Sequence, residues 1–517
     1  MTLFRNKKRE YMAFLKVLVK VLGAFGLGTI LLSCGTSPGY SYTISGTVSA
    51  MIGSGLVLQN NGGDDLSISA NGAFSFKTSL TDGSAYSVTV KTQPASPSQV
   101  CTISNESGTI NSGPVSNIVV NCSMNSTEVT IDPTTTDTFV YVSLYSYTSN
   151  NVSAYKIDKT TGALINNTKA TAGTNPNPVK VATVGSTQYA YVSNIKSGTV
   201  SAFSIDPTTG ALTLVPDTNN PYTAGTYPNP VTVATVNGKQ YAYVSNMGSN
   251  NIYVYSIDPT TGALTAVGSP FATQTSPANV VIDTISSTGT FAYVPNVTSD
   301  AISVYTIDQS TGALIALQTV TTGTYPMFFT VVTINSTTQF AYAANMGSGT
   351  ISVYSIDQTT GALTAVETES AGTYPMSFTV DSSNQYAYVS NVGSATISVY
   401  TIDQTTGALT ASTTTPTVTT GSFPNPVTIA MIGSNRFAYV SNKGSDNIYV
   451  YAIGTDGSLS YRQTMATGNS PNPVKIDTSG QYAYVSSAGD GGIYAYTIDQ
   501  TATALAGQLT AVPGSPF

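Results

Sequence analysis

The chain of 517 residues contains no histidine and no tryptophan, and only 8% of its residues are charged. Without histidine, no Ser/His or Cys/His catalytic arrangement can form, and no side chain has an unperturbed pKa near neutrality. Arg436 and Arg462 are the only arginines after residue 33. The sequence also has no cluster with metal-ligand spacing and no glycine-rich phosphate loop between a strand and a helix. We therefore expect neither a metal nor a cofactor.

Positive charge is scarce outside the N-terminal segment. Residues 1–33 hold six of the 18 basic residues and one of the 25 acidic residues, which leaves a net charge of −12 on the rest of the chain. Proteins that bind nucleic acid cluster Lys and Arg, because these residues displace counterions from the phosphates. The charge therefore argues against a nucleic-acid partner.

The N-terminal segment has the pattern of an export signal. Basic residues are concentrated between Arg5 and Arg9, and an apolar run of 12 residues follows from Val21 to Leu32. A helix that spans a bilayer needs about 20 apolar residues. The pattern therefore predicts a signal peptide over residues 1–33 rather than a membrane helix.

The apolar run ends in Leu31-Leu32-Ser33-Cys34, which resembles the bacterial lipobox. That resemblance implies cleavage before Cys34 and a lipid on its sulfur, and Gly35 after it implies sorting to the outer membrane or cell surface. We expect an exported protein that contacts the membrane through a lipid anchor at Cys34. An ordinary signal peptide with a cysteine near its cleavage site is the alternative.

The chain has three cysteines, and Cys101 and Cys122 remain once Cys34 is assigned to the lipid. In an exported chain such a pair predicts a disulfide, and two buried free thiols are the alternative. A loop of this length would contribute about 3 kcal/mol in the chain-entropy model. Residues 34–42 are predicted to be a tether. Residues 43–123 alternate strand-like runs with Gly, Asn and Asp turns, which predicts a small β-sandwich domain.

The rest of the chain, residues 128–517, is repetitive. The string YAYVSN or a near copy occurs eight times, with its second aromatic position at Tyr141, Tyr191, Tyr243, Tyr293, Tyr342, Tyr388, Tyr439 and Tyr484. Each repeat contains four strand-like runs, for example 231–236, 241–245, 252–257 and 263–267 in the third. Four short strands in about 50 residues are typical of a propeller blade. The predicted fold is therefore all-β, with an eight-bladed β-propeller after the sandwich and a seven-bladed ring as the alternative.

Within each repeat the side chains alternate between bulky and small faces. In the third repeat Tyr241 and Tyr243 point to one face, and Ala242 and Val244 point to the other. Neighbouring blades are therefore expected to pack tyrosine against alanine and valine, which fills the space between sheets without tryptophan.

A second string, IDPTTGAL or a near copy, places an aspartate in six successive repeats at Asp158, Asp206, Asp258, Asp308, Asp357 and Asp403. Aspartate at the start of a turn accepts backbone N–H groups, and glycine four residues later can adopt positive φ. We interpret these aspartates as turn residues rather than as a carboxylate ring for metal or acid-base chemistry.

The YVSN and IDxTTGAL strings resemble the YVTN-repeat propellers and their relatives in the lactonase, or 6-phosphogluconolactonase-like, family. The resemblance implies a propeller over residues 128–517 and lactone hydrolysis as a possible activity. Known lactonase-type propellers have seven blades, and the muconate-lactonizing branch uses His, Arg and Glu. The His has no counterpart in this chain. The preceding segment resembles small Ig-like domains that precede such propellers in bacterial surface proteins.

Two sets of loops are predicted to meet at the channel mouth, one before each blade and one between its second and third strands. They would present aromatic rings at Tyr227, Tyr325, Tyr374 and Phe423, and amides at Asn194, Asn246, Asn296, Asn345, Asn391 and Asn442. Rings among amides and hydroxyls suit a neutral glycan or a protein partner. The alternative is that Pro and Asn merely end the strands.

Lys180 and Lys475 follow the loop prolines and are the remaining cations predicted near the mouth. Lactone hydrolysis needs a general base and oxyanion-stabilising groups, and two lysines on non-adjacent blades supply little of this. We expect a non-catalytic binding or adhesion module on the cell surface. A divergent lactonase-like hydrolase is the alternative, and a structural component of the cell envelope without a ligand of its own is the third hypothesis.

Overall fold

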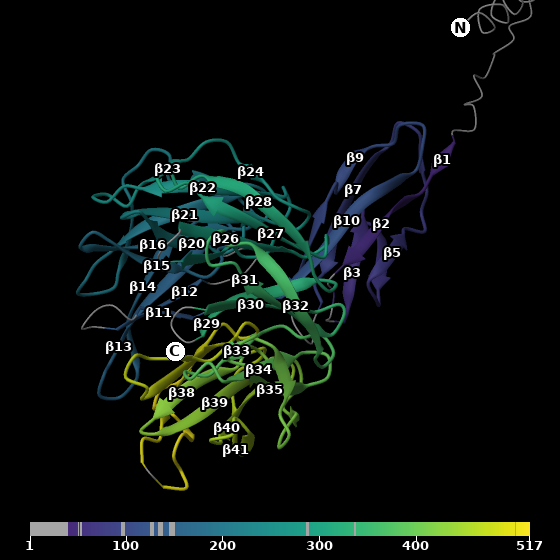
Figure 1. Cartoon of the computed structure of the whole chain (residues 1–517). Helices are drawn as coiled ribbons and strands as arrows, with labels where there is room; N and C mark the ends of the chain where they lie inside the picture. Colours follow the sequence, from purple (N-terminus) through teal and green to yellow (C-terminus); the bar gives the residue numbers. More distant parts are fainter. Residues whose placement is uncertain are drawn as a thin grey trace, which may run out of the picture.

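In the computed structural model, the described residues are 40–49, 51, 54–94, 99–124, 129–132, 138–143, 150–285, 289–334, 338–501 and 503–517. Their regular secondary structure is entirely β, in a small N-terminal domain beside a much larger ring of sheets (Figure 1). Within these residues, no helix has the length and apolarity that a membrane span requires. The predicted signal peptide and Cys34 lie outside the described residues.

The small domain consists of two four-stranded sheets that enclose one core. One sheet has the order β5-β2-β10-β8 and the other β4-β3-β7-β9, while β1 pairs with β6. Side chains such as Leu56, Leu58 and Ile118 are fully buried between the sheets. The strands are β1 (Ser41–Tyr42), β2 (Ile44–Ser49), β3 (Leu56–Asn60), β4 (Asp64–Ile68), β5 (Gly72–Ser75), β6 (Leu80–Thr81), β7 (Ala85–Thr92), β8 (Gln99–Ser104), β9 (Ser107–Thr109) and β10 (Val115–Met124).

The two cysteines of the small domain are cross-strand partners on β8 and β10. Cys101 pairs with Cys122 in the antiparallel register, and a disulfide joins their sulfurs. Both residues are buried in the core. The bridge therefore connects an edge strand of the sheet to the long strand that leads out of the domain.

The large domain contains eight sheets in the described residues, and each is built from one repeat. We number these blades 1 to 8 along the chain. In each blade four antiparallel strands are paired in chain order, and blades 2, 3 and 6 carry an additional strand. Blades 1 to 4 comprise β11 (Val129–Ile131), β12 (Phe139–Ser143), β13 (Asn151–Ile157), β14 (Leu164–Thr171); β15 (Lys180–Val184), β16 (Thr187–Asn194), β17 (Thr199–Ile205), β18 (Leu212–Leu214), β19 (Tyr222–Thr223); β20 (Thr232–Val236), β21 (Lys239–Asn246), β22 (Asn251–Ile257), β23 (Leu264–Ala266), β24 (Phe271–Ala272); and β25 (Val281–Ile285), β26 (Gly289–Asn296), β27 (Ala301–Ile307), β28 (Leu314–Thr321).

Blades 5 to 8 repeat this meander. They comprise β29 (Pro326–Ile334), β30 (Thr338–Asn345), β31 (Thr350–Ile356), β32 (Leu363–Ser370); β33 (Thr379–Val380), β34 (Tyr386–Asn391), β35 (Thr396–Ile402), β36 (Leu409–Ala411), β37 (Thr417–Thr419); β38 (Thr428–Ile432), β39 (Asn435–Asn442), β40 (Asn447–Ile453), β41 (Leu459–Ala466); and β42 (Lys475–Ile476), β43 (Tyr482–Ser486), β44 (Ile493–Ile498), β45 (Leu509–Ala511). The predicted all-β propeller is confirmed, and the described sheets number eight.

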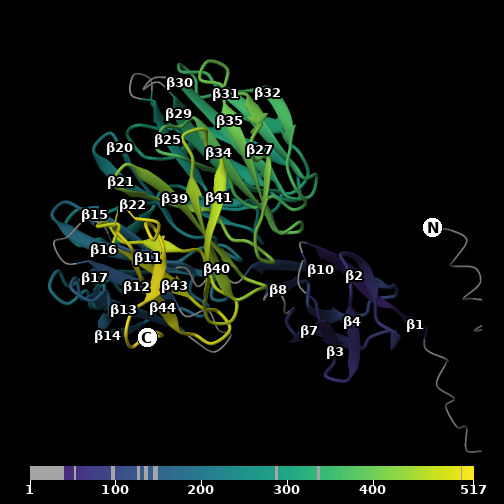
Figure 2. The same ribbon diagram turned by 90° about the horizontal axis from the view of Figure 1, so that it is seen from below.

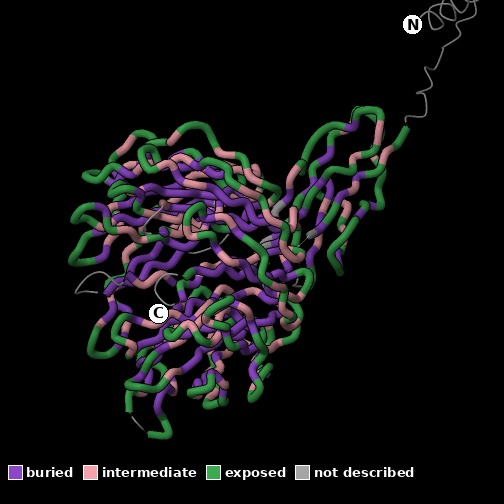
Figure 3. Tube along the Cα trace, viewed as in Figure 1, coloured by how far each residue is buried: buried purple, intermediate pink, exposed green. Residues whose placement is uncertain are grey.

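The blades pack through the alternating faces that the sequence predicts. Tyr189 and Tyr191 of blade 2 share one buried cluster with Ala242 and Val244 of blade 3. All eight repeat tyrosines have 0% exposed surface. Burial follows the sheet interiors around the ring, whereas the connecting turns are exposed (Figure 3).

The turn between the third and fourth strands of each blade docks on the preceding blade. In blade 3, Asp258 Oδ1 accepts hydrogen bonds from the N–H groups of Thr260 and Thr261, which together with the hydroxyl of Thr261 lower the pKa of its carboxyl group. Gly262 has φ of 70°, and its carbonyl accepts the Tyr191 hydroxyl at 3.0 Å. The same tyrosine-to-glycine bond connects seven of the eight blade pairs in the described residues. These aspartates are turn residues, as predicted.

The ring closes between blades 8 and 1. Tyr484 donates to the carbonyl of Gly162 at 2.9 Å, and Tyr482 and Tyr484 pack in one cluster with Val129 and Val140 of blade 1. Each of these two blades takes all four of its strands from its own repeat. The ring is therefore closed by side-chain packing and hydrogen bonds rather than by an exchanged strand.

Candidate functional site

The two sets of predicted mouth loops do meet at one end of the channel. In blade 3, the N–H of Met247 donates to Tyr227 O, and Pro228 forms an isolated β-bridge with Asn246. Equivalent bridges link the loops of blades 2, 4, 6, 7 and 8. In these six blades the loops therefore extend the pairing of the two innermost strands toward the mouth.

The asparagines of the YVSN strings do not line this mouth, which corrects the sequence-based prediction. Asn194, Asn246, Asn296, Asn345, Asn391 and Asn442 all have 0% exposed surface. In blade 2, Asn194 Oδ1 accepts the N–H of Gly173 at 3.0 Å, and its amide donates to the hydroxyls of Thr199 and Ser201. The Asn194 side chain thus links the loop before the blade to the third strand, and its polar atoms are already hydrogen-bonded within the protein.

The four predicted mouth aromatics share one backbone conformation. Tyr227, Tyr325, Tyr374 and Phe423 have φ between 53° and 56°, in the left-handed region. Tyr374 is 38% exposed and the other three are partly buried. The hydroxyl of Tyr227 donates to the carbonyl of Ile103 in β8 of the small domain, at 3.0 Å. This aromatic therefore contacts the small domain, which lies beside the propeller in both ribbon views (Figure 2).

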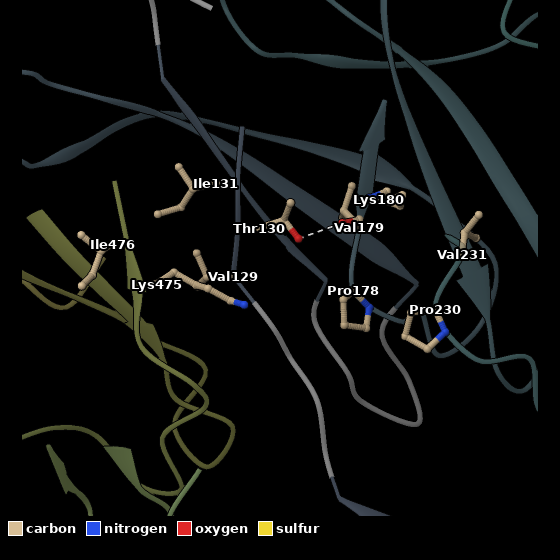
Figure 4. A pocket seen from close by; sticks show the side chains of 10 residues that line it. All are labelled: Val129, Thr130, Ile131, Pro178, Val179, Lys180, Pro230, Val231, Lys475 and Ile476. Atoms are coloured by element: carbon tan, nitrogen blue, oxygen red, sulfur yellow. Dashed lines mark hydrogen bonds between the residues drawn. The ribbon is translucent and has the colours of Figure 1, made fainter. Parts of the chain in front are cut away.

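Lys180 and Lys475 line the same cavity, of about 420 Å³, among the innermost strands (Figure 4). Lys180 begins β15 in blade 2, and Lys475 begins β42 in blade 8. Strand β11 of blade 1 lies between them and contributes Val129, Thr130 and Ile131 to the lining. The volume is in the range of pockets for small molecules.

The remaining lining is apolar apart from one hydroxyl. It is formed by Pro178, Val179, Pro230, Val231 and Ile476, while the hydroxyl of Thr130 donates to Val179 O at 2.8 Å. None of the ten lining residues is acidic. The cavity therefore places two lysines among mostly apolar side chains, an arrangement whose positive charge attracts an anion.

Sequence reasoning treated the two lysines as members of separate blades and missed the cavity. The ring closure brings β42 next to β11, so that blades 8, 1 and 2 are consecutive around the channel. One feature of the sequence could have indicated the cavity: both lysines stand two residues after a loop proline, at the same position of their repeats. That register puts both side chains on innermost strands.

A third lysine near the mouth was also missed. Lys443 lies in the turn of blade 7, is 3% exposed, and has its pKa lowered to about 7 because burial disfavours the ammonium form. Met346 and Val392 occupy the same position in blades 5 and 6 and are also buried. In the sequence, Lys443 is simply the variable residue of an SNxGS string, so nothing there signals its burial.

Comparison with known proteins identifies the propeller repeats. The family model described as "Lactonase, 7-bladed beta-propeller" matches residues 139–234, 221–331, 330–427 and 413–515. These matches extend over most of the chain and leave out the small domain. The description names seven blades, whereas the described residues of this chain form eight such sheets. No curated protein shows significant similarity to the chain.

Several solved structures are similar to the chain at low sequence identity. The Pseudomonas aeruginosa periplasmic gluconolactonase PpgL is 18% identical with a TM-score of 0.49, over 66% of this chain and 98% of that protein. A Bacteroides fragilis protein, a 6-phosphogluconolactonase candidate by its name, is 21% identical with a TM-score of 0.44, over 56% and 83% of the two chains. A protein from Lactobacillus plantarum is 21% identical with a TM-score of 0.46, over 60% and 90%.

Proposed function

The chain belongs to the lactonase family of β-propellers, and on this premise we propose that its channel cavity binds and hydrolyses a lactone that carries an anionic group. The observation that carries this proposal is the convergence of Lys180 and Lys475 on one cavity without an acidic residue in its lining. One ammonium group would hold the anion of the substrate. The other would stabilise the negative charge that develops on the lactone carbonyl oxygen.

The reaction follows from the groups present. Hydroxide or water adds to the carbonyl carbon, the ring C–O bond breaks, and the alkoxide takes up a proton to give the hydroxy acid. No carboxylate or imidazole lines the cavity to act as a general base. Solvent hydroxide is therefore the nucleophile, and kcat/KM should rise about tenfold per pH unit between pH 6 and 8, without a bell-shaped profile.

The test measures hydrolysis of an aldono-δ-lactone with and without a phosphate group. Lys180→Ala and Lys475→Ala should each lower kcat/KM about 100-fold, the cost of losing one oxyanion-stabilising group. Lys180→Arg should recover part of the loss. Lys239→Ala is the matched control, because Lys239 is exposed and does not line the cavity. Equal rates for all four variants would disprove a lactone site here.

A second candidate is binding without catalysis, which the lack of a base in the cavity lining favours. In that case the wild type would bind the hydroxy acid by calorimetry and would not accelerate lactone opening. Lys180→Ala and Lys475→Ala would then weaken binding of the acid, and Lys239→Ala would not. Binding and hydrolysis assays on the same four proteins separate the two candidates.

We also propose that the protein is exported and anchored by a lipid at Cys34, on the basis of the basic N-terminal segment, the short apolar run and the cysteine that follows it. Cys34→Ala should move the protein from the membrane fraction to the soluble fraction. Metabolic labelling with a radioactive fatty acid should mark the wild type and leave the variant unlabelled. A variant that fractionates with membranes as the wild type does would contradict the anchor.

A further inference from the structure

Three consecutive blades carry an aromatic residue at the same position of the mouth loop. These are Tyr325 before blade 5, Tyr374 before blade 6 and Phe423 before blade 7. We call these three residues the aromatic row. Because neighbouring blades stand side by side around the channel, their rings follow one another along part of the mouth.

The fold does not require aromatic residues at this position. Asn175, Ser276 and Ser470 occupy it in blades 2, 4 and 8, with φ of 65°, 56° and 56°. Asparagine adopts this left-handed conformation readily, whereas it is costly for a bulky side chain. The left-handed conformation is thus common to this position in blades 2 to 8, and the aromatic row adopts it with bulky side chains, at a higher backbone cost than asparagine.

Each ring of the row is seated on a glycine of its own blade. A Cβ added to Gly347, Gly393 or Gly444 would lie 2.6, 2.7 or 2.4 Å from the ring of Tyr325, Tyr374 or Phe423. Blades 2 and 4, which lack the aromatic, have Lys196 and Thr298 at the glycine position. The glycine thus leaves room for the ring in blades 5 to 7, and blade 8 keeps the same glycine, Gly489, beside Ser470.

Blade 3 shows that this loop position faces outward from the propeller. Its aromatic, Tyr227, has the same φ and lies over Gly248 in the same way, and its hydroxyl bonds to Ile103 of the small domain. The side chains of the aromatic row, in contrast, make no hydrogen bond to the small domain among the described residues, and Tyr374 is 38% exposed. The three rings of the row therefore occupy the position at which Tyr227 of blade 3 makes a contact outside its own blade.

The surroundings of the row are polar and almost uncharged. Loops 322–327 and 371–376 and turns 345–350 and 391–396 contain no charged residue and provide Thr324, Thr373, Ser348 and Ser394. Three charged residues lie nearby: Asp300 Oδ1 accepts the N–H of Tyr325, Asp446 Oδ1 accepts the N–H of Ser470, and Lys443, whose N–H donates to Phe423 O, is buried. We propose that the aromatic row binds a neutral, hydroxyl-rich polysaccharide, with sugar rings stacked on the aromatic faces and sugar hydroxyls bonded to the adjacent Ser and Thr. This site is separate from the lysine-lined cavity.

The proposal is tested by affinity electrophoresis of the full chain in mild detergent, through gels that contain a neutral β-glucan, a galactomannan or hydroxyethyl cellulose. The wild type should be retarded by at least one of them. Tyr325→Asn, Tyr374→Asn and Phe423→Asn, chosen because Asn175 makes the same turn, should each weaken binding about tenfold, and the triple variant should migrate without retardation. Tyr461→Ala is the control, since Tyr461 is 57% exposed on the outer strand β41.

Melting temperatures show whether the three rings serve to bind a ligand or to pack the fold. The three Asn variants should melt at the wild-type temperature, because they relieve backbone strain as they lose a ring contact. The proposal is overturned if no neutral polysaccharide retards the wild type, if Tyr461→Ala loses retardation equally, or if the Asn variants melt early in proportion to their loss of binding. Crosslinking from position 374 to a protein, without retardation by any polysaccharide, would also overturn it. None of these outcomes depends on lactone hydrolysis.

Discussion

At the scale of single residues, Asp283 and Asp381 occupy the same position in blades 4 and 6 but meet different partners. Gln339 Nε2 donates to Asp283 Oδ1 at 2.8 Å, whereas the guanidinium of Arg436 forms an ion pair with Asp381 and also bonds to Gly454 O at 2.6 Å. Asp283 Oδ2 and Gln339 Oε1 are buried without a partner among the described residues. Burial disfavours the charged carboxylate and raises the pKa of Asp283, and the hydrogen bonds from Gln339 and from the N–H of Thr284 only partly oppose this effect.

This difference predicts opposite effects of the same substitution. A folded-state pKa above the unfolded value means that the carboxyl group favours folding below about pH 4 and that this contribution is lost as the pH rises through the folded pKa. Asp283→Asn should therefore stabilise the protein at pH 7 by about 1 kcal/mol, since its amide can donate to Gln339, and the gain should vanish near pH 4. Asp381→Asn should destabilise the protein at pH 7, because it leaves Arg436 unpaired. Urea unfolding of both variants at the two pH values is the measurement, and a gain for Asp283→Asn that is equal at both values would contradict the account.

At the scale of elements, the D-x-T-T-G turn serves as both a local turn and an interblade contact. Gly262 has positive φ, and a Cβ added to it would lie 2.2 Å from the Tyr189 ring of the neighbouring blade. Its carbonyl also accepts the Tyr191 hydroxyl. The turn is thus constrained by its own backbone and by the blade before it.

A matched pair of glycines separates these two constraints. Gly238 has φ of 75° and no heavy atom within 4 Å of an added Cβ, so Gly238→Ala should cost only the conformational term, about 1 kcal/mol. Gly262→Ala carries the same term and must also displace a buried ring, so we expect a loss of at least about 3 kcal/mol. Chemical denaturation of both variants measures the difference. Equal losses would mean that the turn glycine is needed only for its φ.

The sequence predicts elements better than it predicts which side chains reach a surface. The eight strand sets and the Asx turns follow from local patterns, because alternation and turn chemistry act within a few residues. The burial of Asn246 does not follow from the string YVSN, since its partners Gly225 and Asn251 come from a preceding loop and the next strand. The cavity between Lys180 and Lys475 depends on contacts between the two ends of the repeat region, which no local pattern records.

At the scale of the whole molecule, seven blade interfaces join blades that are also consecutive in the chain, and the interface between blades 8 and 1 does not. We call this interface the seam. Its first strand, β11, pairs with β12 of its own blade, and the contacts across the seam include the Tyr484–Gly162 bond and the packing of Tyr482 and Tyr484. The lysine-lined cavity lies against β11 and β42, so the seam also shapes the candidate lactone site.

The seam is therefore expected to open before the other interfaces, and a matched pair of tyrosines tests this. Tyr484→Phe removes the bond to Gly162 at the seam, and Tyr342→Phe removes the equivalent bond to Gly407 between blades 5 and 6. Each change leaves a buried carbonyl unpaired, at a cost of about 1 to 3 kcal/mol. At the seam no chain connection holds the two blades together, so this cost should appear as local opening. Native-state hydrogen exchange should accelerate about fivefold or more in β11 and β42–β45 for Tyr484→Phe, and remain near wild-type rates in blades 5 and 6 for Tyr342→Phe. If the cavity hydrolyses a lactone, hydrolysis should fall only in the seam variant, because opening displaces Lys475 from Lys180. Equal acceleration of hydrogen exchange at both interfaces would instead show that the ring opens as one cooperative unit.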